Sequence, residues 1–227
     1  MKLGKLTPEE EKRIRDYVKE KVRGNDIAHG WDHIECVVNL ARKIGKKEGA
    51  NMRILIPAAY FHDIVPRKSV GEHDEHSKAS AKEAGNFLKR IGFTDEEIEM
   101  IMRTIVTSSY EAHERGIEPE LLEAKVLRDA DLLDAMGARG IARVFAFAGA
   151  YGCPEGLGKL EWDPRNPPKF KMNLKGPDPS AIYHFASKLL WLKDSILTEE
   201  GKRLARGRHE FMIKFLERYG KEIKGTL

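Results

Sequence analysis

The segment at residues 51–62 is apolar on nearly every side of a helix, and it constrains the fold more than any other stretch of the chain. Asn51 is suited to cap its first turn, and Pro66 follows its last turn. A helix without a polar face is typically central, because each of its sides must be covered by other elements. We therefore expect the rest of the chain to pack around this segment.

Helix start and stop signals recur along the remaining sequence. Thr7 and Glu10 form a capping box with Pro8 at the first helical position, and Thr94 and Glu97 form a second box. No segment alternates between apolar and polar residues as a half-buried strand would, so the predicted fold class is all-α. Besides the segment at 51–62, helices are expected at residues 8–23, 31–48, 77–91, 95–108, 119–135, 138–151, 180–195 and 198–219.

The length of 227 residues fits one domain with a full hydrophobic core. We expect that core at about residues 25–150, with C-terminal helices at 180–220 packed on it. Between them, residues 152–179 lack periodicity and hold six of the ten prolines. This composition predicts a long surface loop or lid inside a single domain that spans residues 1–227.

Charge and hydropathy exclude several classes of protein. The chain has 40 Lys and Arg against 36 Asp and Glu. A charge balance this close to neutral does not favour a nucleic acid as partner. No apolar run is long enough for a membrane span or resembles a signal peptide, which predicts a cytoplasmic protein without a membrane partner. Cys36 and Cys153 are expected to be free thiols, and they are too few for a thiolate metal site.

The pair His62-Asp63, directly after the apolar segment, is the most informative feature for function. Burying both side chains without partners would be costly. One interpretation is a core histidine beside a locally paired aspartate. Another is a metal site, because His29 and His33 lie four residues apart and can share one face of a helix.

A group of three carboxylates in the expected helix at 119–135 strengthens the second interpretation. Asp129, Asp131 and Asp134 lie among apolar residues, where they repel each other unless a cation or a basic partner neutralises them. Imidazole and carboxylate ligands together suit Mn, Fe, Co, Ni, Zn or Mg. The sequence thus predicts a divalent metal ion. Arg139 and Arg143 supply positive charge nearby or pair with Asp134.

The order His33, His62-Asp63, Asp131 resembles the H…HD…D signature of the HD superfamily of phosphohydrolases. Longer blocks, over about residues 25–220, resemble a bacterial and archaeal subfamily of stand-alone HD hydrolases: AHGWDHIECVVNLARKI, ILIPAAYFHDIV, LLEAKVLRDADLLDAMGARGIARVFAF and YHFASKLLWLKDSILTEEGKRLARGRHEFMIKFL. The resemblance implies a single compact helical HD-domain fold. It also implies one divalent metal ion held by His33, His62, Asp63 and Asp131.

Two-metal branches of this family add histidines between the doublet and the last aspartate. His76 and His113 lie in that interval, and they join Asp63 as candidate catalytic residues that bind a second metal, bind phosphate or transfer a proton. An exposed loop position is the alternative for each histidine. Pro66 stands where some HD nucleotidases carry a glutamate, which weighs against a simple monophosphate-nucleotidase mechanism.

Four further residues are candidates for binding substrate. His184 and Lys188 are four residues apart on one helix face and match a recurrent pattern of the subfamily, with a structural role as the alternative. His29 belongs to the same group through its spacing from His33. Arg67 follows the metal doublet closely, and its alternative is a position in a solvated loop.

The resemblance implies a metal-dependent phosphohydrolase of small phosphorylated metabolites, and nucleotides are the expected substrates. Release of pyrophosphate from nucleoside or deoxynucleoside triphosphates is the best single prediction. A cyclic-nucleotide phosphodiesterase and a non-catalytic nucleotide sensor are the alternatives, and a nucleic-acid-binding protein is the least favoured class. A second metal ion and a homodimer both stay open.

Overall fold

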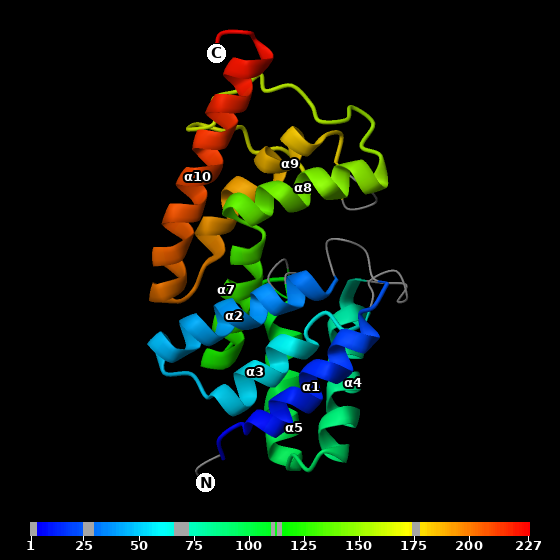
Figure 1. The fold of residues 1–227 in the computed structure, drawn as a ribbon. Helices are drawn as coiled ribbons and strands as arrows, with labels where there is room; N and C mark the ends of the chain where they lie inside the picture. Colours follow the sequence, from blue (N-terminus) through cyan, green and yellow to red (C-terminus); the bar gives the residue numbers. More distant parts are fainter. Residues whose placement is uncertain (1–3, 25–29, 66–72, 110–111, 113–114, 174–177) are drawn as a thin grey trace. The chain divides into compact units, whose positions relative to one another are not determined.

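A computed structural model of the chain describes residues 4–24, 30–65, 73–109, 112, 115–173 and 178–227 (Figure 1). Throughout these ranges the secondary structure is helical and no strand is found, which confirms the predicted all-α fold class. Cys36 and Cys153 are free thiols, as expected. Within the described ranges, no helix is long and apolar enough to cross a lipid bilayer.

The helices begin and end close to the predicted positions. Among the described residues, the helices up to Tyr151 include α1 (Pro8–Lys21), α2 (Trp31–Glu48), α3 (Met52–Phe61), α4 (His73–Arg90), α5 (Asp95–Ser108), α7 (Leu122–Asp134) and α8 (Gly137–Tyr151). They are followed by α9 (Ala181–Ser187), the 3-10 helix η2 (Leu189–Ser195) and α10 (Glu199–Ile223). The helix expected at 180–195 is thus divided, because Lys188 leaves the helical region with φ −141°.

The chain folds into two compact units. Unit 1 comprises Met1–Asp131 together with Leu197–Glu200, and unit 2 comprises Leu132–Ile196 together with Gly201–Leu227. The expectation that residues 1–227 form one domain, with the C-terminal helices packed on the core, stays a prediction.

In unit 1, α3 is the central helix, as its apolar composition predicts. It contacts α1, α2, α4 and α5, and every residue from Arg53 to Phe61 is buried (Figure 1). The Asn51 side chain caps it by accepting a hydrogen bond from the Arg53 backbone nitrogen at 2.9 Å. The position of α3 matters for function because His62 and Asp63 follow its last residue and are therefore carried into the interior.

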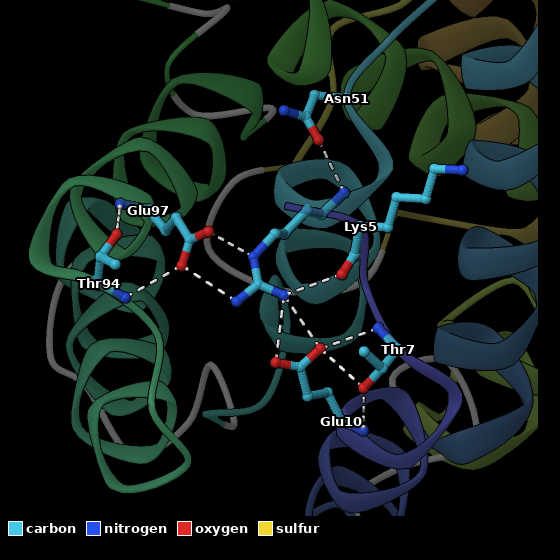
Figure 2. A network of polar contacts seen from close by, with 7 residues as sticks. Lys5, Thr7, Glu10, Asn51, Thr94 and Glu97 are labelled. Carbon is cyan, nitrogen blue, oxygen red and sulfur yellow. Dashed lines mark hydrogen bonds and ion pairs between the residues drawn. The ribbon is translucent and has the colours of Figure 1, made fainter. Parts of the chain in front are cut away.

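Arg53, the only charged residue of α3, joins the beginnings of three helices (Figure 2). Its guanidinium donates two hydrogen bonds to Glu97, one of them at 3.2 Å, and two to Glu10, at 3.0 and 3.2 Å. These glutamates are the third helical residues of the capping boxes at Thr7 and Thr94. One buried guanidinium thereby ties the first turn of α3 to the first turns of α1 and α5.

Unit 2 is built around aromatic rings. Phe145 of α8 lies 6.4 Å from Phe185 of α9 and 5.8 Å from Phe215 of α10, measured between ring centroids. The long connection after α8 is held by backbone hydrogen bonds, from Glu155 to the Pro179 carbonyl at 2.8 Å and from Ile182 to the Leu157 carbonyl at 3.0 Å. The Pro-rich connection is therefore tied to the start of α9 at several points.

Candidate metal centre

Four ionisable side chains meet inside unit 1. His33 lies in the first turn of α2, His62 and Asp63 directly follow the last residue of α3, and Asp131 lies in α7. Three of these side chains are buried, while Asp131 keeps 30% of its side-chain surface exposed. Residues 33, 62–63 and 131 are far apart in sequence, so only the packing of α2 and α7 near the end of α3 brings them together.

The ring nitrogens of the two histidines lie close to each other and to oxygens of the two carboxylates. The Nε2 atoms of His33 and His62 lie 3.2 Å apart. His33 Nε2 lies 3.6 Å from Oδ2 of Asp63 and 3.6 Å from Oδ1 of Asp131. His62 Nε2 lies 4.0 Å from each of the same two oxygens. For His33, His62 and Asp131, the ligand atoms all lie within 4.8 Å of one another.

These separations match those expected between the ligands of one metal ion. Ligand atoms about 2.1 Å from an ion are separated by about 3.0 Å at a right angle, about 3.4 Å at a tetrahedral angle and about 4.2 Å when opposite. The observed values of 3.2, 3.6 and 4.0 Å lie within that range. Two imidazoles with a carboxylate suit a divalent transition metal, so His33, His62 and Asp131 fit the ion that the sequence predicts.

The ring of His62 is oriented by a backbone contact one turn earlier in α3. Its Nδ1 lies 2.8 Å from the carbonyl oxygen of Ala59, which can only accept a hydrogen bond. The proton of a neutral His62 is therefore on Nδ1, and the lone pair of Nε2 points toward His33. Metal-ligating histidines are commonly held by such a contact.

His76 joins this cluster from α4. Its side chain is buried, and its Nδ1 lies 3.8 Å from Oδ1 of Asp63. The other carboxylate oxygen of Asp63 is the one that faces His33 and His62. Asp63 thus lies between the pair of histidines and His76, and an exposed loop position for His76 is wrong.

Asp129, the first of the two aspartates that flank Asp131, lies in unit 1 and has a structural partner. It is fully buried, and it accepts hydrogen bonds from the Leu197 and Thr198 backbone nitrogens at 2.8 and 2.7 Å and from the Thr198 hydroxyl at 2.6 Å. Burial raises the pKa of Asp129, although these bonds oppose the rise. Asp129 therefore fixes the residues that precede α10.

Asp134 is equally buried and belongs to unit 2. It accepts hydrogen bonds from Arg139 at 2.7 Å and from Arg143 at 2.6 Å. The expected pairing of these two arginines with Asp134 is confirmed. Among the described residues, the group of ligand atoms that lie within 4.8 Å of one another contains Asp131 and neither flanking aspartate.

In unit 2, His184 has a partner that the sequence analysis missed. Its Nδ1 lies 2.7 Å from Oδ2 of Asp178, which also accepts a hydrogen bond from the Ser187 hydroxyl at 2.6 Å. Lys188 ends the same short helix as its C-cap. Asp178 lies in the Pro-rich connection, which has no periodicity, so no pattern in the sequence linked it to His184.

Three candidate site residues lie outside the described part of the chain. They are the substrate-binding candidates His29 and Arg67 and the catalytic candidate His113. Their roles stay predictions.

Comparison with known proteins identifies the family. A family model described as HD domain matches residues 30–136, a span that contains all four side chains of the cluster. The chain is also 34% identical over 215 residues to YpgQ of Bacillus subtilis, and the alignment covers 93% of each chain. The chain belongs to the HD superfamily.

Solved structures of the HD superfamily share this fold. The crystal structure of Bacillus subtilis YpgQ in complex with ADP is similar with a TM-score of 0.68 and 33% identity, over 95% of this chain and 98% of that one. An HD-superfamily hydrolase from Bacillus thuringiensis is similar with a TM-score of 0.69 and 31% identity, over 95% of this chain and 97% of that one. The chain therefore has the fold of the HD-superfamily hydrolases, whose HD domains bind divalent metal ions.

Proposed function

We propose that this protein is a metal-dependent phosphohydrolase that releases pyrophosphate from nucleoside or deoxynucleoside triphosphates. The observation that carries the proposal is the convergence of the His33 and His62 Nε2 atoms with carboxylate oxygens of Asp63 and Asp131, at 3.2–4.0 Å. The crystal structure of YpgQ with ADP supports a nucleotide as the substrate class.

In the proposed reaction, the oxygen of a water molecule attacks the α-phosphorus of the substrate. The bond from that phosphorus to the bridging oxygen breaks, so that a nucleoside monophosphate and pyrophosphate are formed and the water loses a proton. A divalent ion held by His33, His62, Asp63 and Asp131 would supply Lewis acidity toward the phosphate and the water.

The chain's own residues orient this site and accept the proton. The Ala59 carbonyl keeps the lone pair of His62 Nε2 directed toward His33. His76 Nδ1 lies 3.8 Å from Oδ1 of Asp63. From this position His76 orients the carboxylate and can exchange a proton with it. We further propose that His113 shares the catalytic role and that His29, Arg67, His184 and Lys188 bind the substrate.

A substrate panel tests the proposal. Nucleoside and deoxynucleoside triphosphates, cyclic nucleotides and simple phosphate monoesters are each incubated with Mn, Co, Ni, Zn or Mg, and products are identified by chromatography. We expect a monophosphate and pyrophosphate in equal amounts, and no product with a chelator or with His62→Ala. Hydrolysis of cyclic nucleotides alone would favour a phosphodiesterase, and nucleotide binding without turnover would favour a sensor.

A further inference from the structure

The turn that follows α3 determines whether His62 and Asp63 can act together. Adjacent side chains on an α-helix diverge by about 100°. Nevertheless, Nε2 of His62 and Oδ2 of Asp63 lie 3.2 and 3.6 Å from the same atom, Nε2 of His33. The pair can share this neighbour because α3 ends at Phe61, directly before it. The contacts that end α3 thus bear on the arrangement of the metal centre.

The hydrogen bonds of two backbone nitrogens mark this helix end. The Ile64 nitrogen donates to the Phe61 carbonyl at 3.2 Å, three residues earlier, as in a 3-10 turn. In a continuing α-helix, the Val65 nitrogen would donate to that same carbonyl. It donates instead to the hydroxyl of Ser80 in α4, at 3.3 Å. The acceptor that takes the place of the next helical turn therefore comes from α4.

Ser80 and His76 contact this turn from one face of α4. They are four residues apart in the helix, so their side chains lie one above the other. Both are buried, with 0% and 4% of their surface exposed. His76 Nδ1 lies 3.8 Å from Oδ1 of Asp63, while Ser80 bonds to the backbone two residues further on. This face of α4 thus meets the turn at a side chain and at the backbone.

The Ser80 hydroxyl brings no advantage to α4 as a helix. Alanine has a higher helix propensity, and a buried hydroxyl costs free energy unless it is hydrogen-bonded. A serine inside a helix can bond to a carbonyl of its own helix, as Ser108 of α5 does with the Ile105 carbonyl at 3.1 Å. The Ser80 hydroxyl contacts a nitrogen 15 residues earlier in the chain, and so it acts on the turn after α3.

We infer that Ser80 is a positioning residue of the metal centre. By accepting the Val65 N–H, its hydroxyl holds the turn in which His62 and Asp63 both face His33. The inference rests on the proposed function for the presence of a metal ion. It deepens that proposal by giving a role to a residue that no sequence motif indicated.

Removing the hydroxyl is expected to weaken metal binding. The Val65 nitrogen loses its acceptor, and the turn can extend into a further helical turn in which the side chains of His62 and Asp63 diverge. Replacing residues that orient metal ligands typically lowers metal affinity by about 10–100-fold. Ser80 acts through the backbone and not on a ligand side chain, so we expect the lower end of this range.

The experiment measures Mn binding to the full chain by calorimetry for the wild type, Ser80→Ala and the matched control Ser108→Ala. Both serines are buried in helices of unit 1, with 0% and 5% exposed. Ser80→Ala should raise the dissociation constant about tenfold, and Ser108→Ala should leave it within about twofold. Urea midpoints, measured with a chelator, should shift by similar amounts in both variants. Amide exchange followed by NMR should become faster at Val65 in Ser80→Ala alone.

A second variant covers the case in which Ser80→Ala does not fold. Ser80→Cys keeps a side chain of similar size but replaces the hydroxyl by a weak acceptor. It should raise the Mn dissociation constant and the exchange rate of the Val65 amide in the same direction. An unchanged dissociation constant in this variant would count against the inference in the same way as in the alanine variant.

Failure of this inference is distinguishable from failure of the proposed function. If the wild type binds Mn and hydrolyses nucleotides while the Ser80 variants bind Mn equally well, only the inference is overturned. Equal losses of affinity in Ser80→Ala and Ser108→Ala would also overturn it, because they would reflect general packing. A wild type that binds Mn without turnover contradicts the proposed function alone. A wild type that binds no divalent ion overturns both.

Discussion

The two ends of α3 carry buried polar clusters of opposite character. At its beginning, the Arg53 guanidinium is paired with the carboxylates of Glu10 and Glu97 (Figure 2). At its end, the carboxylates of Asp63 and Asp131 face the rings of His33 and His62, which carry charge only when protonated. The first cluster contains its own cation, and the second brings imidazole nitrogens and carboxylate oxygens together.

Burial does not distinguish these clusters, since Arg53, His62 and Asp63 keep only 9%, 8% and 8% of their surface exposed. What differs is the charge that the protein itself supplies. A cluster that neutralises its own charges stabilises the fold, whereas a cluster of acceptors is suited to a bound cation. We therefore expect changes at the beginning of α3 to affect stability, and changes at its end to affect metal binding and turnover.

The largest expected effect is on turnover, from Asp63→Ala. Under the proposed function, removing the Asp63 carboxylate lowers metal affinity and takes away the negative charge beside His76, so metal-dependent hydrolysis should fall by more than about a hundredfold. Rates are measured with saturating Mn, and circular dichroism checks that helix content is kept. The matched control is Asp16→Ala, since the Asp16 side chain is 55% exposed on α1. A folded Asp63→Ala protein that hydrolyses substrate at the wild-type rate would refute the metal role of Asp63.

The next effect is on stability, from Arg53→Met. This change leaves the buried Glu97 and the half-buried Glu10 without their guanidinium, which costs about 3–5 kcal/mol of unfolding free energy. The rate per folded molecule should change little at low temperature. The unfolding free energy is measured by urea denaturation in the absence of metal.

A control of the same residue type separates burial from ion pairing in that experiment. Arg165 also pairs with two glutamates, Glu210 and Glu217, but its side chain is 54% exposed. Exposed ion pairs contribute little, so Arg165→Met should cost less than about 1 kcal/mol. Similar losses of unfolding free energy for the two arginine variants would contradict the difference expected between a buried cluster of ion pairs and exposed ion pairs.

Much of this fold could be read from local chemistry in the sequence. The capping boxes at Thr7 and Thr94 and the Asn51 cap act through neighbouring residues, and the structure confirms each of them. The predicted start of α4 was late, since the helix begins at His73 rather than at Ser77. Polar residues there gave no apolar periodicity from which the first turn could be recognised.

Interactions across long stretches of sequence were harder to predict. The signature places His33, His62, Asp63 and Asp131 in one family pattern, but only packing shows that His76 reaches Asp63. Arg53 stands out in the sequence as the single charge in a helix otherwise composed of apolar residues. Its partners lie 43 and 44 residues away, so charge alone could not have identified them.

A smaller effect is expected on stability from metal binding. An ion that binds only the folded chain raises the unfolding free energy by about 2.7 kcal/mol at a concentration of 100 times its dissociation constant. This increment should appear in the wild type and in Arg53→Met, because both keep the end of α3 intact. Thermal unfolding with and without Mn measures it, and Asp63→Ala should lose most of it. An increment lost in Arg53→Met would show that the two ends of α3 are coupled.

The smallest expected effect is a pH dependence confined to the Arg53 cluster. Burial would raise the pKa of Glu97 and of Glu10, but hydrogen bonds from Arg53 and from the capping threonines outweigh it and lower both. The stability that these groups contribute is therefore present above the ordinary glutamate pKa of about 4.3 and is lost as pH falls through their lower folded-state values.

In Arg53→Met the sign reverses, because the buried Glu97 and the half-buried Glu10 are favoured in their protonated form without the guanidinium. That variant should regain stability as pH falls, so its deficit relative to the wild type should be largest near pH 7 and should shrink below about pH 4. Urea denaturation of both proteins across that range, with a chelator present, measures the difference. A deficit that is constant with pH would mean that Arg53 stabilises unit 1 through its packing on Phe93, whose ring centroid lies 4.2 Å away, and not through its charge.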